Sequence, residues 1–224
     1  MQTARSHALY FLATGMLAVL PPSAVAQTGG VAEPRFDFGL GGGLALPAKK
    51  SMSALSTTAD AGFKTGYTLQ SWLGHDMYDW IGGEVRYEYS RQDLEISGGG
   101  KKVGFGGRSH ALHYDLIFYG AKPRSRVRPY AFAGGGLKVY EGDGAESAFP
   151  PLSEIAVLTS TSQIKGLISF GGGVKFKMSP NVSFRAEFRD NVTSFPDEVI
   201  VPTLAKEPGW IHQMMVLFGV AFHF

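Results

Sequence analysis

The chain has 224 residues, no cysteine, and a formal net charge of +2 at pH 7. The absence of cysteine excludes disulfides, thiolate metal sites and thiol nucleophiles, and the nearly balanced charge gives no support for nucleic-acid binding. Glycine is abundant, with 30 residues, and helical periodicity is hard to find, which favours an all-β protein.

The first segment has the pattern of a cleaved secretory signal. Arg5 precedes an apolar run from Leu9 to Leu20, which is followed by the small-residue triplet Ala24-Val25-Ala26. We expect cleavage after this triplet, so that residues 1–26 form the signal and residues 27–33 a short periplasmic segment. An uncleaved amphipathic anchor is the alternative. No other window reaches the roughly 18 apolar residues of a spanning helix, so any membrane span is expected to consist of strands.

Eight later segments show apolar residues at every second position, which is the repeat of a β-strand. They are Pro34 to Leu46, Gly62 to Gly74, Trp80 to Arg91, Arg108 to Tyr119, Pro129 to Glu141, Ile164 to Met178, Val182 to Thr193, and Trp210 to Phe224. Long connections (47–61, 92–107, 142–163 and 194–209) alternate with short ones (75–79, 120–128 and 179–181). This asymmetry is typical of outer-membrane barrels, whose short turns face the periplasm and whose long loops face outward.

The third and seventh predicted strands each carry charged residues on one face. In a closed barrel of eight strands they lie across the lumen from each other and run in the same direction. The triplet Glu84, Arg86, Glu88 then faces Arg185, Glu187, Arg189, with opposite charges on each level. Such a barrel is only wide enough for side chains, and buried charges are costly unless they are paired.

We therefore predict a lumen that is closed by ion pairs. The predicted members are Glu84, Arg86, Glu88, Asp115, Lys175, Arg185, Glu187 and Arg189, with Lys177 as a further candidate. Two interpretations remain open. The network is either a static polar plug, or a gate in which re-paired charges open a narrow path for ions.

Aromatic residues gather near the predicted strand ends, where a large apolar side chain with a polar edge suits the boundary between lipid and water. The predicted belt consists of Trp80, Tyr119 and Tyr130 at the short-turn end, and Tyr89, Tyr140 and Trp210 at the long-loop end. In the fifth strand, Tyr130 and Phe132 are out of phase with Leu137 and Val139, so a bulge or glycine kink is expected at residues 134–136.

Catalytic and metal-binding patterns are weak. Ser109 and His113 share a strand face but are separated by four residues, about 13 Å at strand rise, which is too far for a catalytic triad. His110 and His113 point to opposite faces and cannot chelate one ion together. We predict no enzyme activity, no metal and no cofactor, and we expect His113 and Asp115 to form an interior polar pair. The glycines of residues 41–43 are expected to let neighbouring groups approach closely.

The last strand places apolar residues on alternate positions up to the final Phe224. Its pattern of Phe218, Val220, Phe222 and Phe224 resembles the terminal signal that the barrel assembly machinery reads in the small outer-membrane barrels of the OmpA/OmpX-like family. The segment Arg128 to Leu137, with Pro129-Tyr130 and three glycines, is similar to a strand common in these barrels. The resemblance covers Pro34 to Phe224.

The resemblance implies an all-β, eight-stranded, antiparallel up-and-down transmembrane β-barrel in the outer membrane of a Gram-negative bacterium. It implies a monomer with a structural or surface-interacting role, surrounded by lipid and lipopolysaccharide, and with at most narrow channel activity. Basic residues near the long-loop end are candidates for contacts with lipopolysaccharide phosphates, or they form a solvated surface; they are Lys49, Lys50, Arg91, Lys101, Lys102 and Arg108.

Three other functions stay open. A soluble, periplasmic, lipocalin-like barrel would turn the same alternation inside out and bind an apolar ligand, but the loop asymmetry and the aromatic terminus argue against it. A lipid A-modifying barrel enzyme is a less favoured alternative, because the His-x-Ser-Asn pattern of the lipid A deacylases is absent. The long loops are also candidates for adhesion or for binding a host factor.

Overall fold

The computed structural model describes residues 35–54, 57–98, 100–142, 156–158, 161–202 and 209–224. The expected signal (1–26), the expected periplasmic segment (27–33) and Pro34 lie outside the described residues. Within the described ranges, no helix is both long enough and apolar enough to cross a membrane.

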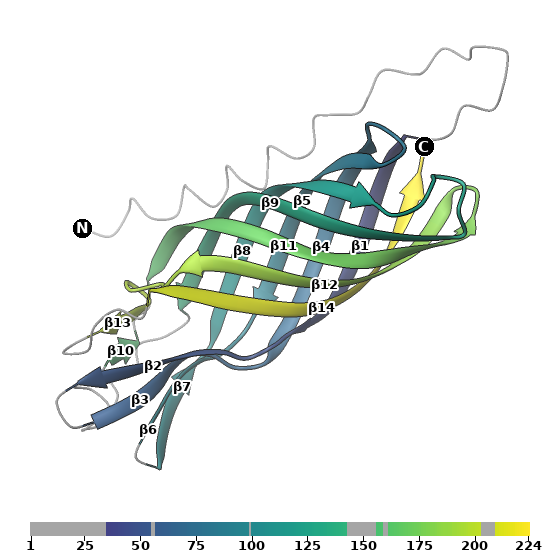
Figure 1. Ribbon diagram of the computed structural model, residues 1–224. Coiled ribbons are helices and arrows are strands. Elements are labelled where there is room, and N and C mark those ends of the chain that lie inside the picture. Colours follow the sequence, from purple (N-terminus) through teal and green to yellow (C-terminus); the bar gives the residue numbers. More distant parts are fainter. Residues whose placement is uncertain (1–34, 55–56, 99, 143–155, 159–160, 203–208) are drawn as a thin grey trace, which may run out of the picture. The chain divides into compact units, whose positions relative to one another are not determined.

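Eight strands close into an antiparallel barrel, as predicted (Figure 1). They are β1 (Phe36–Ala45), β4 (Gly66–Asp76), β5 (Ile81–Arg91), β8 (Gly107–Tyr119), β9 (Val127–Gly142), β11 (Ser162–Ser179), β12 (Val182–Ser194) and β14 (Trp210–His223). The order around the barrel is β1-β14-β12-β11-β9-β8-β5-β4, and β1 pairs with both β14 and β4. Closure therefore leaves none of these strands with an unpaired edge.

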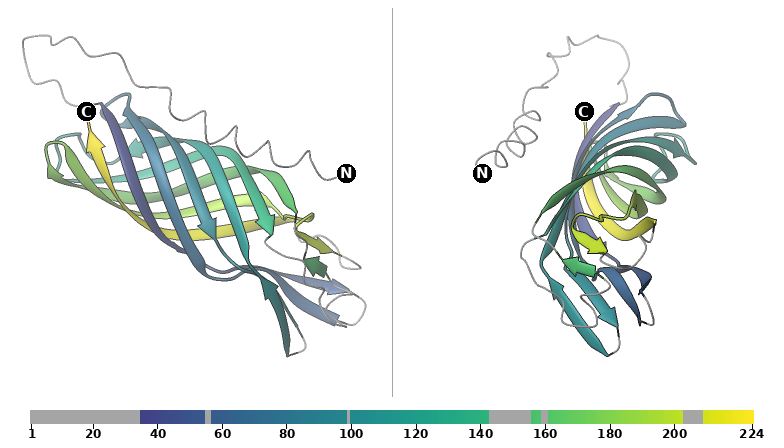
Figure 2. Two further views of the ribbon diagram at one scale, coloured as in Figure 1. Left: turned by 180° about the vertical axis from the view of Figure 1, so that it is seen from behind. Right: turned by 90° about the vertical axis from the view of Figure 1, so that its left-hand side faces the viewer.

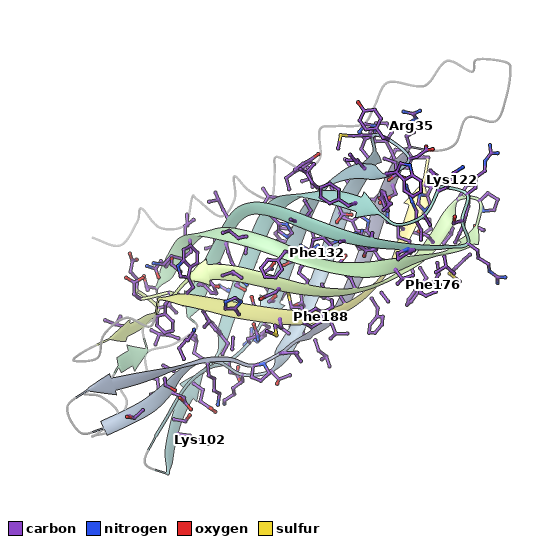
Figure 3. All side chains as sticks on the ribbon, in the orientation of Figure 1. Arg35, Lys102, Lys122, Phe132, Phe176 and Phe188 are labelled. Atoms are coloured by element: carbon purple, nitrogen blue, oxygen red, sulfur yellow. The ribbon has the colours of Figure 1, made fainter. Side chains whose placement is uncertain are left out.

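The barrel wall is apolar on the outside. In β8 the outward side chains of Leu112, Tyr114, Leu116 and Phe118 are 40–50% exposed, whereas the alternate residues Ala111, His113, Asp115 and Ile117 are buried. Phe176 and Phe188 project from the wall in the same way (Figure 3). A continuous exposed apolar surface of this kind suits lipid rather than water. It is the reverse of the arrangement that the lipocalin-like alternative requires.

Both chain ends of the barrel and the short turns lie at one end. The amide of Phe36 donates to the carbonyl of Phe224, and the amide of Phe224 donates to the carbonyl of Phe36. Arg35 and Lys122 mark this end in Figure 3, and Lys102 marks the opposite one. The described parts of the long connections therefore share one end of the barrel, which we call the long-loop end.

Segments that the sequence suggested were loops form further strands at the long-loop end (Figures 1 and 2). A four-stranded sheet has the order β2 (Ala48–Ala54), β3 (Thr57–Phe63), β6 (Leu94–Gly98) and β7 (Lys101–Phe105), and β10 (Ala156–Leu158) pairs with β13 (Ile200–Pro202). The expected strand Gly62 to Gly74 is divided, because β3 ends at Phe63 and pairs with β6, while β4 starts at Gly66 and pairs with β1 and β5.

The four-stranded sheet has one apolar and one polar face. Leu94 and Ile96 are fully buried, and Phe63 stacks on Tyr140 with ring centroids 5.4 Å apart. Because Tyr140 lies in the lumen, this stacking joins the apolar face of the sheet to the upper lumen. On the other face Lys49 donates to Glu95 across 2.5 Å.

The structure of β9 contradicts two predictions, namely the bulge at residues 134–136 and the outward position of Tyr130. It is continuous over 16 residues, and its pairing with β8 and β11 runs without a register shift, so the bulge expected at residues 134–136 is absent. Tyr130 and Phe132 point into the lumen instead. A register shift lies instead in the pairing of β11 with β12, between Lys177 and Ser179.

The predicted aromatic belt is wrong for three of its six members. Tyr119, Tyr130 and Tyr140 are buried in the lumen, where their hydroxyls meet interior polar groups. Trp80 and Trp210 are at least half exposed, and Tyr89 is partly exposed on the outer face of β5. A strand-end position alone thus does not separate a lipid-facing tyrosine from an inward-facing one.

Glycine in β1 and β14 makes room for the indole of Trp72, which fills the lumen from β4. A Cβ on Gly39 would lie 2.1 Å from this ring, and a Cβ on Gly219 would lie 2.6 Å from it. Trp72 is fully buried and donates its indole N–H to Asp37 Oδ1 over 2.9 Å. Among the glycines of residues 41–43, for which close approach was expected, a Cβ on Gly41 or Gly43 would meet the carbonyl oxygen of Phe218 or Val216 on β14.

The charged lumen as the candidate functional site

The barrel order places β5 and β12 opposite each other, four positions apart in a ring of eight. Both strands run from the short-turn end to the long-loop end. Their inward side chains are therefore able to meet across the lumen, level by level.

Three ion pairs cross the lumen. They join Glu84 Oε2 to Arg185 Nη1 at 2.5 Å, Arg86 Nη1 to Glu187 Oε1 at 3.1 Å, and Glu88 Oε1 to Arg189 Nε at 3.4 Å. All six side chains are buried. The structure thus brings together the two triplets in the order in which the sequence aligned them.

Glu187 has four polar partners in this network. Its carboxylate lies within 3.1 Å of Arg86, 3.2 Å of Arg185 and 2.9 Å of Arg189. The hydroxyl of Tyr130 also donates to it over 2.7 Å. One buried carboxylate therefore pairs with three guanidinium groups. These groups need its negative charge to stay charged while they are buried.

Two residues of β8 extend this network. Asp115 pairs with Arg189 at 2.8 Å and with His113 Nδ1 at 3.0 Å. His113 Nε2 is 3.5 Å from Glu88, which also accepts a hydrogen bond from Asn191 over 2.7 Å. The expected interior pair of His113 and Asp115 is therefore part of a larger network.

The lumen is polar at the short-turn end as well. Lys175 donates to Asp37 over 2.9 Å and to the hydroxyl of Tyr119 over 3.0 Å. Arg128 donates to Asp76 at the rim. Lys177, expected as another member, is only partly buried.

Aromatic rings line the network and explain why some aromatic residues point inward. Arg86 and Arg185 lie over the ring of Trp72, at 5.2 and 5.0 Å from its centroid. Arg189 lies 4.0 Å from the ring of Phe132. Such contacts stabilise a guanidinium most when water is excluded. The lumen is therefore filled by alternating charged and aromatic side chains.

The interior charges balance. Apart from Arg128, which is paired with the partly buried Asp76 at the short-turn rim, the buried lumen carboxylates of the described part are Asp37, Glu84, Glu88, Asp115 and Glu187, and the cations are Arg86, Lys138, Lys175, Arg185 and Arg189. Five negative charges thus meet five positive ones when His113 is neutral. This balance favours a dry, closed interior.

Sequence reasoning missed Asp37, Trp72 and Lys138. Lys138 is buried and donates to the side-chain oxygen of Gln213. It alternates with Leu137 and Val139, so the spacing in this half of β9 indicated its inward position. Asp37 sits between the exposed residues Phe36 and Phe38, and Trp72 lies on the face of β4 opposite to the exposed Leu69 and Leu73, so strict alternation would have found both.

Ion pairs outside the lumen hold the long-loop end together. Lys165 and Gln163 donate to Asp197 over 2.5 and 2.9 Å, and the Lys165 bond holds the pKa of Asp197 below its usual value of 3.8. In the four-stranded sheet, the hydrogen bond from Lys49 lowers the pKa of Glu95.

The described residues contain no group of three or more His, Asp or Glu side chains placed to hold a metal ion. His110 points outward and hydrogen-bonds the hydroxyl of Tyr87 over 2.7 Å, while His113 points inward. The two histidines are thus on opposite faces of β8, as their spacing indicated.

Residues 10–224 match the model of the outer membrane protein beta-barrel domain. The chain belongs to this outer-membrane barrel family. It is an integral protein of the outer membrane, and lipid is the environment of its exposed apolar wall.

Solved structures show the same fold. Neisserial surface protein A is 16% identical with a TM-score of 0.53, and the match covers 84% of this chain and 97% of that one. OprG of Pseudomonas aeruginosa is 15% identical with a TM-score of 0.53, and the match covers 86% of this chain and 98% of that one. No curated protein sequence matches the chain. Identities this low show the fold and do not assign an activity.

Proposed function

We propose that this outer-membrane protein is a closed, non-catalytic barrel with a structural role, which presents its long-loop sheet at the cell surface. The three ion pairs across the lumen carry this proposal. They occupy the space that an aqueous channel would need, and an eight-stranded barrel has little space beyond its side chains.

The buried charges have several partners each, and this favours the static plug over the gate. Arg86 contacts Glu84, Glu187 and Gln70. Breaking one buried ion pair costs about 3–5 kcal/mol, and a path along the axis needs several pairs broken together. An open state would thus be too rarely populated to conduct.

Planar-bilayer recording tests the plug. We expect the purified protein to show no stepwise conductance, and Arg86→Ala and Glu187→Ala to show none either, since the remaining charges and aromatic rings still fill the lumen. Regular opening steps in the unmodified protein, altered in these variants, would support the gate instead.

A surface role is supported by the order of the long loops. Four of their segments form a sheet with a charged face, so the chain presents a defined surface rather than loose loops. Deleting the gene and comparing envelope permeability with surface adhesion separates a structural role from an adhesive one. Loss of adhesion with unchanged permeability would favour the adhesive role.

We also propose a monomer whose last strand is read by the barrel assembly machinery. Phe218, Phe222 and Phe224 are about half exposed along the outer face of β14 and its end, and Val220 lies on the same face. Replacing Phe224 by Ala should lower the amount of heat-modifiable, folded protein in the outer-membrane fraction. An unchanged amount would argue against this role.

A further inference from the structure

At the short-turn end, the inner face of the wall carries a pair of cations that the chain itself compensates. Arg128 on β9 is directly opposite Lys175 on β11. Like charges in this position are destabilising, but Arg128 donates to Asp76, and Lys175 pairs with Asp37 at 2.9 Å. The structure thus places one carboxylate beside each of these two cations.

A second pair of cations lies one level nearer the solvent on the same face. Arg126 lies two residues before Arg128 and Lys177 two residues after Lys175, so both share the inward phase. The amide of Lys177 donates to the carbonyl of Arg126 over 2.8 Å. Arg126 is exposed and Lys177 partly exposed, and neither forms an ion pair with a residue that the structure describes. Because this pair faces the mouth of the lumen rather than the lipid, an anion that balances it would approach from the aqueous side.

The turn that joins β8 to β9 holds part of this surface in place. It contains four basic residues and no acidic one. Arg128 donates to the carbonyls of Ala121 over 3.1 Å and of Asp79 over 2.7 Å. The amide of Ser125 donates to the carbonyl of Lys122 over 3.0 Å, and the exposed side chain of Lys122 lies at this end of the barrel (Figure 3). A surface that is already ordered loses less conformational entropy when it binds a partner.

An exposed aromatic ring lies on the neighbouring turn, between β4 and β5. Tyr78 is 72% exposed, two residues beyond the end of β4, and its amide donates to the carbonyl of Ile81 over 2.9 Å. The amide of Tyr119, at the end of β8, donates to the carbonyl of Trp80 over 2.9 Å, which joins the two turns. A tyrosine ring in water offers a flat apolar face and a hydroxyl that forms hydrogen bonds. Cations and an aromatic ring are thus combined at this end of the barrel.

We propose that Lys122, Arg126, Lys177 and Tyr78, which we call the basic rim, bind a sugar polymer that carries carboxylates, the chemistry of peptidoglycan. Charge-assisted hydrogen bonds join carboxylates to guanidinium and ammonium groups, and the ring of Tyr78 provides a face for a sugar. Repeated weak contacts along one polymer add to the overall affinity. The proposal rests on the proposed structural role, with the short turns in the periplasm, and it names a partner for that role.

Co-sedimentation of the detergent-purified protein with isolated peptidoglycan sacculi tests the basic rim. We expect at least about tenfold weaker binding by Arg126→Gln/Lys177→Gln, which removes two charge-assisted contacts. Tyr78→Ala should weaken binding by a smaller factor. Sacculi whose carboxylates have been converted to amides should retain little of the unmodified protein.

A matched variant separates the basic rim from general charge effects. Lys50→Gln/Lys102→Gln removes the same charge at the long-loop end, from one partly exposed and one exposed side chain, and it should bind sacculi like the unmodified protein. Heat-modifiable gel mobility verifies the folding of each variant. Unchanged binding by Arg126→Gln/Lys177→Gln, or an equal loss in the matched variant, would overturn the proposal.

Inner-leaflet phospholipid is the competing partner, and native mass spectrometry with phosphatidylglycerol tests it. We expect the unmodified protein and Arg126→Gln/Lys177→Gln to retain this lipid equally, because the two side chains have the inward phase. Loss of the lipid in the variant, together with unchanged binding to sacculi, would assign the basic rim to the membrane and refute the proposal.

The orientation is tested separately, because the chain has no cysteine of its own. Ser125→Cys introduces a single thiol into the turn between β8 and β9. A membrane-impermeant maleimide should label it only after the outer membrane has been permeabilised. Labelling in intact cells would refute the orientation and the role of the basic rim in the cell. Failure of the sacculus assay alone would refute the basic rim and leave the closed barrel standing.

Discussion

Replacing Glu187 by Gln should destabilise the barrel more than any exposed charge replacement. The variant keeps the size of the side chain and an oxygen that accepts hydrogen bonds, but it removes the negative charge shared by Arg86, Arg185 and Arg189. Breaking a buried ion pair by removing one partner costs about 3–5 kcal/mol. Because Glu84 and Asp115 still neutralise part of the charge, we expect a loss of about 3 kcal/mol.

Urea unfolding in phospholipid vesicles, followed by the gel mobility of the folded barrel, measures this loss. A loss of this size changes the ratio of folded to unfolded protein by about a hundredfold. The control Asp79→Asn removes an exposed carboxylate in a short turn and should change the free energy of unfolding by less than about 0.5 kcal/mol. Adding Arg86→Gln to Glu187→Gln should cost less than the sum of the single changes, because the two groups interact. If Glu187→Gln is no worse than the control, the buried ion pairs do not hold the lumen closed.

Three further predictions concern other parts of the wall. Gly39→Ala should lower the free energy of unfolding by about 1–3 kcal/mol, because the new Cβ would lie 2.1 Å from the indole ring of Trp72. Urea unfolding measures this loss, and the control is a glycine-to-alanine change at a position where the new Cβ would meet no neighbouring atom. His212→Leu should lower the free energy of unfolding by about 1–3 kcal/mol in the same assay, because it leaves the carboxylate of Asp190 unpaired on the outer wall. In the unmodified protein His212 Nδ1 lies 2.7 Å from this carboxylate. Adding Asp190→Asn should restore most of the lost stability. The lowered pKa of Asp197 contributes stability that is complete above 3.8 and is lost as pH falls through the lower folded value, so pepsin should cut the segment around Asp197 faster as pH falls below 3.8. Lys165→Ala removes the main cause of the lowered pKa, so it should speed cleavage above pH 3.8 and weaken this acid dependence.

Alternation was sufficient to predict the barrel wall. From Leu112 to Phe118 in β8 and from Met214 to Phe222 in β14 every second residue is apolar, and a strand offers only two faces, so the inward set follows from the outward one. The same rule aligned the charged triplets of β5 and β12, since the number of strands fixes which strands are opposite. These features depend only on local spacing and on closure.

The inward aromatic residues could not be predicted in this way. Tyr130 and Phe132 have the composition of a lipid-facing strand, and only the guanidinium groups of Arg185 and Arg189 explain their inward position. Those contacts join residues more than fifty positions apart. The phase of the first half of β9 was therefore misread.

The loop strands were missed for a related reason. Apart from Met52, residues 48–54 are small or charged and show no strand alternation of their own. They become a strand because β3 supplies hydrogen-bonding partners beside them, while β6 pairs with the other edge of β3. Pairing of this kind depends on the position of the neighbouring strand, which the barrel sets.

Quenching of tryptophan fluorescence by lipids brominated on their acyl chains tests most directly which face of the strands meets the membrane. One protein would retain only Trp72, which is buried in the lumen, and a second would carry only Leu116→Trp, at an outward position that is 43% exposed. We predict strong quenching for the second and much weaker quenching for the first. Stronger quenching of Trp72 than of the residue at position 116 would contradict an apolar outer wall around a charged lumen.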